Sequence, residues 1–279
     1  MPPTLLVLLA IASVQIGAAF AKSLFDDVGP GGAVFLRVLF AAIVLVLIWR
    51  PRLSGQTRRD LSLAVLFGLV LAGMNLAFYS ALDRIPLGIA TTLEFVGPLG
   101  VAVFASRRPL DLVWVGLAGA GIVLLSGFGG ESLDGLGVAL ALLAGGLWAA
   151  YILVSARVGQ AFPGGAGLAL AMVVATVPLA PVGVAAAGEE LLVPWILAAG
   201  AAVGILSSAI PYALELEALR RLPVGVFGVL MSLEPAVAAL AGFVVLGERL
   251  AAREVVAILL VVAASAGAAR GAKLAPRDT

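Results

Sequence analysis

The stretch ALDRIPLGIATTLEFVGP at residues 81–98 recurs without a gap as ALRRLPVGVFGVLMSLEP at residues 218–235. Seven of the 18 aligned positions are identical, and four more exchange one aliphatic residue for another. A second pair, VGPGGAVF at 28–35 and AFPGGAGL at 161–168, matches at a shift of 133 residues instead of 137. The chain therefore looks like one unit written twice, and the relative orientation of the two copies decides what the repeat means.

The composition predicts an integral membrane protein. Of the 279 residues, 62% are hydrophobic and only 12% are charged, which leaves too little polar surface for a soluble fold. The apolar stretches are long enough for a helix to cross about 30 Å of hydrocarbon, and they lack the alternation of barrel strands. We therefore predict an all-α integral membrane protein with ten spans, at residues 4–25, 31–49, 61–82, 86–106, 110–128, 135–158, 165–187, 195–219, 224–246 and 253–269.

The missing residue types narrow the chemistry. The chain has no Cys and no His, which excludes disulfides, thiol chemistry and the usual zinc sites, so we expect no metal and no cofactor. A proton that crosses this protein would be carried mainly by a carboxylate. The net charge of +1 gives no reason to expect nucleic-acid binding. No phosphate-binding GxxxxGK(S/T) motif is present, so any transport would be driven by gradients and not by ATP hydrolysis.

Loop charges predict the orientation. The connections after even-numbered spans, with the tail, hold twelve Lys and Arg residues, whereas those after odd-numbered spans hold three and most of the acidic residues. This bias places both termini in the cytoplasm, and we expect Met1 to begin the mature protein because no cleavage pattern follows the first span. Five spans per unit is an odd number, so the repeat is inverted. We expect a first repeat at 1–132, a second, inverted repeat at 133–270 and a short cytoplasmic tail at 271–279.

Three of the prolines inside predicted spans have polar side chains beside them. Pro98, Pro211 and Pro235 each leave the carbonyl four residues earlier without its helical donor; for Pro211 this carbonyl belongs to Ser207. Broken helices at membrane depth are tolerated where protein surrounds them or where they line a watery cavity. The prolines therefore mark either a cavity or structural kinks that neighbouring Ser and Thr side chains relieve.

Charged side chains inside the spans are candidates for a site, because each costs about 3 kcal/mol to insert at the bilayer centre. Arg37 and Glu94 lie about 9 and 12 Å below the outer ends of their spans, so we expect them to pair, either as a structural clamp or as part of the site. Glu234 lies near the midplane, and Leu170 occupies the position of its own unit that matches Arg37. A buried carboxylate without a fixed cation can bind a proton or an ammonium group, unless Lys22 or Arg37 reaches it from the other unit.

Further polar residues share single faces of otherwise apolar spans, and such stripes point into the bundle. They are Ser208, Tyr212 and Glu215 in one span, Asn75 and Tyr79 in a second, and Gln15 and Lys22 in a third. Lys22 lies about 5 Å from the end of its span, so its ammonium group could equally extend to the interface. Glu217 precedes Arg220 and Arg221 at helical spacing, which indicates a surface ion pair.

Together these groups fit a zwitterion. A bound amino acid would place its carboxylate near Lys22 or Arg37. Its ammonium group would lie near Glu94, Glu215 or Glu234, while Asn, Tyr and Ser side chains fix its orientation.

The chain also resembles a known family, the EamA branch of the drug/metabolite transporter superfamily, and within it the exporters of threonine and homoserine. The resemblance covers roughly residues 4–267 and rests on ASVQIGAAFAKSLF (12–25), PLGIATTLEFVGPLGVAVFASRRPLDLVWV (86–115), SSAIPYALE (207–215) and MSLEPAVAALAGFVVLGE (231–248). It implies a ten-helix basket of two inverted five-helix repeats in the bacterial inner membrane, which exports small amino acids or related metabolites in exchange for protons. The polar residues that match the family are Gln15, Lys22, Arg37, Glu94, Tyr212, Glu215 and Glu234.

Other functions stay open at the level of sequence. A broader metabolite or drug exporter would need a large aromatic pocket, for which four Trp and three Tyr provide little material. An intramembrane enzyme would need a nucleophile with its base, and Lys22 with Ser208 is the dyad that these residues offer. A receptor without transport activity is a further alternative, which the lack of a soluble domain disfavours. We expect a transporter and no enzyme.

Overall fold

The computed structural model describes residues 1–52, 55–106, 111–125, 133–219, 221–222, 227 and 230–272, and all regular secondary structure in these ranges is helical. The first half contains α1 (Pro3–Lys22), α2 (Phe25–Trp49), α3 (Arg58–Leu82), α4 (Leu87–Glu94), α5 (Val96–Ser106) and α6 (Asp111–Leu125). The second contains α7 (Gly135–Ala161), α8 (Ala166–Ala187), η1 (Gly188–Leu192), α9 (Pro194–Gly204), η2 (Ile205–Ala209), α10 (Ile210–Leu219), α12 (Glu234–Leu246) and α13 (Ala252–Ala272). Parts of two predicted spans (110, 126–128, 224–226 and 228–229), Arg220, and 273–279 of the tail lie outside the described residues.

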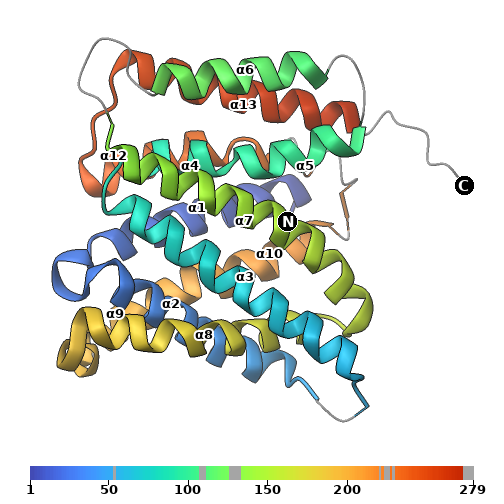
Figure 1. Cartoon of the computed structure of the whole chain (residues 1–279), viewed down its shortest axis with the longest axis vertical. Coiled ribbons are helices and arrows are strands. Elements are labelled where there is room, and N and C mark those ends of the chain that lie inside the picture. Colours follow the sequence, from blue (N-terminus) through green and yellow to red (C-terminus); the bar gives the residue numbers. More distant parts are fainter. Residues whose placement is uncertain are drawn as a thin grey trace, which may run out of the picture.

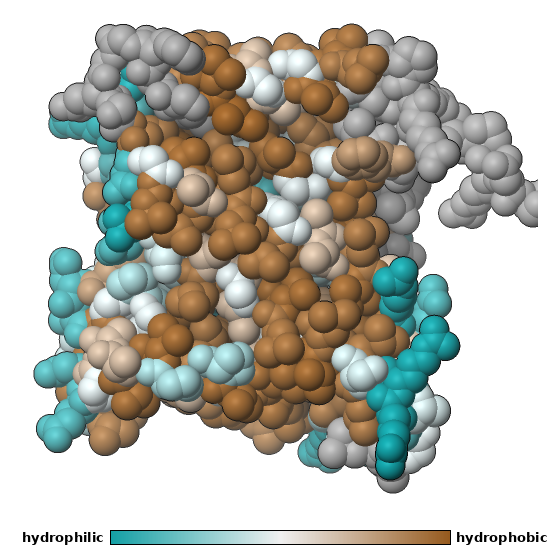
Figure 2. Space-filling model, in the orientation of Figure 1, coloured by the Kyte–Doolittle hydropathy of each residue, from teal (hydrophilic) through white to brown (hydrophobic). Residues whose placement is uncertain are grey.

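Six helical segments in the described ranges are long and apolar enough to cross a membrane. They are Pro3–Lys22, Phe25–Trp49, Arg58–Leu82, Gly135–Ala161, Ala166–Leu192 and Pro194–Tyr212. Shorter apolar helices cover Leu87–Val101, Leu112–Leu124 and Glu234–Leu246. Their exposed side chains are largely aliphatic and aromatic. Figure 2 shows an apolar band between two opposite polar edges, as expected for a bundle surrounded by lipid.

The two halves of the chain interleave. The main packing pairs are α2 with α8, α3 with α7 and with α8, α6 with α13, α1 with α10, and α4 with α12 (Figure 1). Each pair joins a helix from the first half to one from the second, so the interior of the bundle is an interface between the halves.

Three predicted spans differ from simple helices. The second is preceded by a short helical turn that starts at Phe25. A kink at Gly29, with a positive φ of 64°, separates this turn from the helix proper, which begins close to the predicted residue 31. The fourth is divided at Phe95 into α4 and α5. The eighth contains a π-helical turn, η2, directly before Pro211, where proline removes a donor from the helical ladder.

The α4–α5 break packs backbone to backbone against α7. A Cβ added at Gly145 would lie 2.6 Å from the Glu94 carbonyl oxygen, and one added at Gly97 would overlap the Gly145 carbonyl. Small residues allow such close approach where burial of apolar side chains gains nothing relative to lipid. These two glycines therefore fix the position of the broken helix against the second half.

The ends of the bundle differ in charge. At the end where α1, α3, α8 and α12 finish, here called the acidic end, lie Asp26, Asp27, Asp83, Asp134, Glu189, Glu190, Glu248 and Glu254. At the opposite, basic end lie Arg50, Arg52, Arg58, Arg59 and Arg157. Asp134 caps α7, and the backbone N–H of Gly137, with help from Arg84, holds the pKa of its carboxyl below the usual value.

Adjacent glycines of α7 provide a test of the close packing. We expect Gly145→Ala to lower the free energy of unfolding in detergent by about 1–3 kcal/mol, because its methyl group would meet the Glu94 backbone. Gly146→Ala is the matched control, since a Cβ there meets nothing within 4 Å. Equal unfolding midpoints for the two variants would contradict this packing.

Candidate transport site

A cavity of about 500 Å³ lies inside the bundle and is lined by both halves of the chain. Its polar lining residues are Gln15, Arg37, Asn75, Glu94, Tyr151, Ser207, Tyr212, Glu215, Ser232, Glu234 and Ser265. Seven of the ten candidates from the sequence therefore meet in one place: Gln15, Arg37, Asn75, Glu94, Tyr212, Glu215 and Glu234. Pro98 and Pro211 also line it, and Pro235 is buried beside Glu234, so the helix breaks accompany the cavity.

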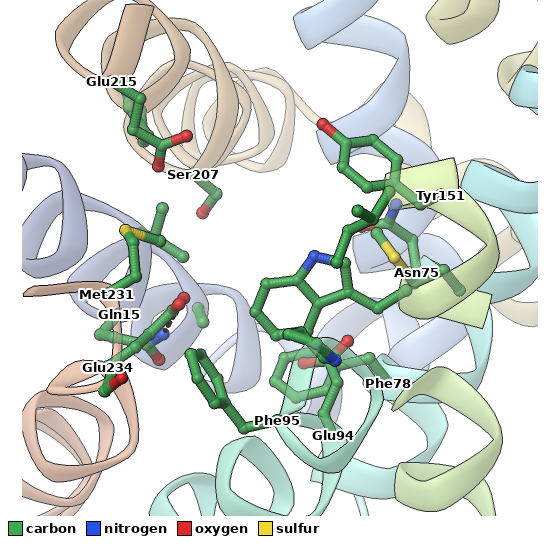
Figure 3. Close-up of a pocket in the computed structure, with 18 of the residues that line it drawn as sticks. Gln15, Asn75, Phe78, Glu94, Phe95, Tyr151, Ser207, Glu215, Met231 and Glu234 are labelled. Atoms are coloured by element: carbon green, nitrogen blue, oxygen red, sulfur yellow. Dashed lines mark hydrogen bonds between the residues drawn. The ribbon is translucent and has the colours of Figure 1, made fainter. Parts of the chain in front are cut away.

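Gln15 and Glu234 form a hydrogen-bonded pair across the two halves. Gln15 Nε2 donates to Glu234 Oε1 at 3.0 Å, and both side chains are buried. Figure 3 shows them together on one wall, from α1 and α12. Gln15 Oε1 and Glu234 Oε2 have no hydrogen-bond partner among the described residues. Two neighbouring acceptors without donors are suited to an ammonium group or, at the carboxylate, to a proton.

Arg37 binds the carbonyl that Pro211 leaves free. Its Nη2 donates to Ser207 O at 3.2 Å, and its guanidinium lies 5.4 Å from the centroid of the Tyr79 ring. The structure therefore provides a partner for the helix break that the sequence predicted. The expected ion pair between Arg37 and Glu94 is absent among the described residues. The two side chains line the same cavity, but the guanidinium is engaged by the π-helical segment instead.

The three cavity carboxylates come from three helices. Glu94 ends α4, Glu215 lies on α10 and Glu234 begins α12. All three line the same cavity. Glu217, two residues after Glu215, instead forms an ion pair with Arg221 near the surface, which confirms its predicted role.

Sequence reasoning missed the aromatic wall of the cavity. Trp148 and Tyr151 lie one turn apart on α7, and Phe95 meets Trp148 edge to face at 5.3 Å between ring centroids. Tyr151 stacks on Phe67 at 5.1 Å. The i, i+3 spacing of two aromatic residues in an otherwise aliphatic span was the available signal.

Lys22 lies outside the cavity, contrary to one of its two predicted roles. Its Nζ forms an ion pair with Glu248 Oε1 at 2.7 Å and donates to Ile85 O at 3.1 Å. The last turn of α1 extends beyond the cavity to the acidic end, so the ammonium group finds a carboxylate from the α12–α13 connection. Lys22 consequently does not reach Glu234, which is paired by Gln15 instead.

Two other candidates are buried but do not line the cavity. Tyr79 is fully buried beneath Arg37 and contacts Phe25 and Phe78. Ser208 is also fully buried, and its Oγ has no hydrogen-bond partner among the described residues. Since Lys22 is bound to Glu248, the Lys22–Ser208 dyad of the enzyme alternative is not formed.

A bundle of apolar helices that holds a polar cavity beside broken helices, between two interleaved halves, defines a membrane transport protein. A family model described as the EamA-like transporter family matches residues 1–127 and again 135–270. The chain belongs to this family and is therefore a multi-pass membrane transporter and not an enzyme, which confirms the family resemblance of the sequence.

Curated relatives agree with this assignment. Threonine/homoserine exporter RhtA of Salmonella typhimurium (strain LT2) is 44% identical over 270 residues, which cover 95% of this chain and 90% of that protein. The protein of the same name from Escherichia coli (strain K12) is also 44% identical over 270 residues. One crystal structure, 22% identical, aligns with a TM-score of 0.64 over 95% of this chain and 96% of that chain, which shows the fold alone.

Proposed function

We propose that this chain is a secondary transporter of the inner membrane that exports small amino acids, similar to threonine or homoserine, in exchange for protons. The observation that carries the proposal is the buried Gln15–Glu234 pair, which lines the same cavity as Arg37. The names of the curated relatives support the substrate class.

The cavity supplies a group for each charge of the substrate. The ammonium group would bind at Glu234 Oε2 and Gln15 Oε1, which lack donors. The carboxylate would bind near Arg37, which remains as the cationic candidate because Lys22 lies outside. Ser232 and Tyr212 line the same space and would orient the substrate.

Proton coupling would follow from competition for one carboxylate. Glu94, Glu215 and Glu234 line one cavity, and carboxylates gathered in one site compete to bind a proton or a cation. A proton and a substrate ammonium group would then alternate at Glu234, so each displaces the other.

The fold supplies a frame for alternating access. We infer ten spans in two inverted repeats, 1–132 and 133–270, with the short tail 271–279 and both termini in the cytoplasm. The packing pairs support this symmetry. When each helix is replaced by its counterpart in the other repeat, the α3–α7 pair becomes the α10–α1 pair, and the pairs α2–α8, α4–α12 and α6–α13 stay the same. The concentration of arginine at the basic end supports the orientation. Rocking of the repeats around the cavity would expose it to either side.

Substitution of Glu234 tests the coupling. In proteoliposomes with an imposed proton gradient, we expect Glu234→Gln to lower threonine transport at least about tenfold, the equivalent of about 1.4 kcal/mol. Raising the pH should tighten substrate binding in the parent, because protons leave the shared carboxylate, and this dependence should vanish in the variant. Glu217→Gln on the surface of α10 is the control and should transport normally.

The role of the carboxylates fails if Glu234→Gln and Glu94→Gln both transport as well as the parent. The export proposal itself fails if the parent accumulates no small amino acid or amino-acid analogue under an imposed proton gradient.

Trp148 offers a direct test of where substrate binds. We expect threonine to change the tryptophan fluorescence of purified parent protein, because Trp148 lines the cavity. The change should disappear in Trp148→Phe and persist in Trp195→Phe, whose indole is exposed on the bundle surface. A response that survives Trp148→Phe would place the binding site elsewhere.

A broader metabolite or drug exporter is the second candidate, favoured by the aromatic wall of Phe78, Phe95, Trp148 and Phe227. Competition separates the two. Bulky aromatic cations should not compete with threonine transport if the first proposal holds, and strong competition by them would favour the second.

A further inference from the structure

We propose that Lys22, Glu248 and the α3–α4 turn form a latch that holds the acidic end of the cavity closed, and that this latch must open when substrate is released there. The inference rests on the proposed function for its direction, because release at the acidic end corresponds to export. It concerns residues outside the substrate cavity.

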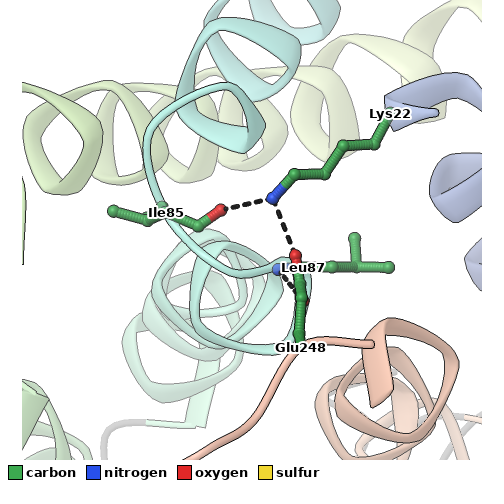
Figure 4. A network of polar contacts seen from close by, with 4 residues as sticks. All are labelled: Lys22, Ile85, Leu87 and Glu248. Carbon is green, nitrogen blue, oxygen red and sulfur yellow. Dashed lines mark hydrogen bonds and ion pairs between the residues drawn. The ribbon is translucent and has the colours of Figure 1, made fainter. Parts of the chain in front are cut away.

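The latch joins three segments through a single carboxylate and a single ammonium group (Figure 4). Glu248 Oε1 pairs with Lys22 Nζ at 2.7 Å, and Glu248 Oε2 accepts from the backbone N–H of Leu87 at 2.9 Å. Lys22 Nζ also donates to the Ile85 carbonyl at 3.1 Å. The turn is therefore held twice where it enters α4, once by each partner of the ion pair.

The backbone after α12 positions Glu248 for this contact. Gly247 adopts a positive φ of 68°, and the Glu248 N–H donates to Gly242 O at 3.1 Å, so the chain folds back over the end of α12. The carboxylate then lies against Gly242, where an added Cβ would overlap Glu248 Oε2. A larger residue at 242 would displace the carboxylate without removing its charge.

The latch lies beyond the cavity on the side of the acidic end. On α1 the cavity is lined by Val14, Gln15 and Ala18, and Lys22 is one turn further toward this end. On α4 it is lined by Glu94, whereas Leu87 at the other end of this helix is fully buried. Access from the acidic end would therefore have to pass the latch.

The contacts cross between the halves of the chain. Lys22, Ile85 and Leu87 belong to the first half, and Glu248 belongs to the second. A rocking motion that separates the halves at this end would have to break them. The Lys22 and Glu248 side chains are only 22% and 14% exposed, so solvent screens their attraction less than it screens a surface pair.

The same end contains a natural control. Arg84 Nη1 and Asp134 Oδ2 form an ion pair at 3.1 Å with both side chains 38% exposed. Both residues belong to connections at the acidic end, but exposed pairs contribute little to stability. Loss of this pair should leave the closure unchanged.

Labelling of a single thiol tests the latch without any substrate. Because the chain has no Cys, Ala18→Cys places a unique thiol on the cavity wall. In intact cells, a maleimide that cannot cross the inner membrane should label this thiol slowly in the latched protein. We expect Glu248→Gln, Lys22→Gln and Gly242→Ala each to raise the labelling rate. The increase should be on the order of tenfold for Glu248→Gln and Lys22→Gln, because each removes one charge of the ion pair. Lys22→Arg and Arg84→Gln should label like the parent.

The outcomes separate the latch from the proposed function. Equal labelling of the parent, Glu248→Gln and Lys22→Gln would overturn the latch, and so would rapid labelling of the parent. Asp83→Cys on the exposed α3–α4 turn reports the orientation; if it resists labelling in cells, the same comparison is made in inside-out vesicles. Failure of amino-acid transport with the expected labelling pattern would overturn the proposed substrate and leave the latch standing.

Discussion

Hydrocarbon offers no hydrogen bonds, so each polar group at membrane depth needs a partner inside the bundle or space for a ligand. This constraint organises the interior. The carbonyl that Pro211 releases binds Arg37, Thr92 Oγ1 returns to the Gly88 carbonyl, and Gln15 holds one oxygen of Glu234. Four buried side-chain atoms without a partner among the described residues belong to residues that line the cavity, namely Gln15 Oε1, Ser207 Oγ, Glu234 Oε2 and Ser265 Oγ.

Much of the architecture followed from the sequence. Hydropathy located the helices, because lipid imposes one length and one composition on every span. The prolines predicted where the helices break. The interruption at Phe95 lies three residues before Pro98, and the π-helical turn η2 lies shortly before Pro211. Family membership then confirmed the transporter class. The charges inside the spans predicted most of the polar cavity, because an ionisable group is rarely retained there without a role.

Pairing of side chains was less predictable. Arg37 and Glu94 lie at similar depth, yet depth alone does not say which side chain faces which, and the released Ser207 carbonyl competes for the guanidinium. Lys22 shares a helix face with Gln15, so the sequence allowed it a role in the site as well as one at the interface. This face continues past the cavity to the end of the bundle, where Lys22 lies. Its partner, Glu248, is distant in sequence and belongs to a connection whose direction depends on the positive φ of Gly247.

The contact of Gly97 and Gly145 beside Glu94 has a mechanical consequence. A contact between two backbones contains no side-chain rotamers that must change when the partners rotate. The two halves could therefore pivot about this contact without rearranging side chains, so that it would act as a fulcrum. Displacement grows with distance from a fulcrum, and α4 extends from this contact to the turn that Lys22 and Glu248 hold. A rotation too small to disturb the carboxylates at the centre would therefore strain the ion pair at the rim first.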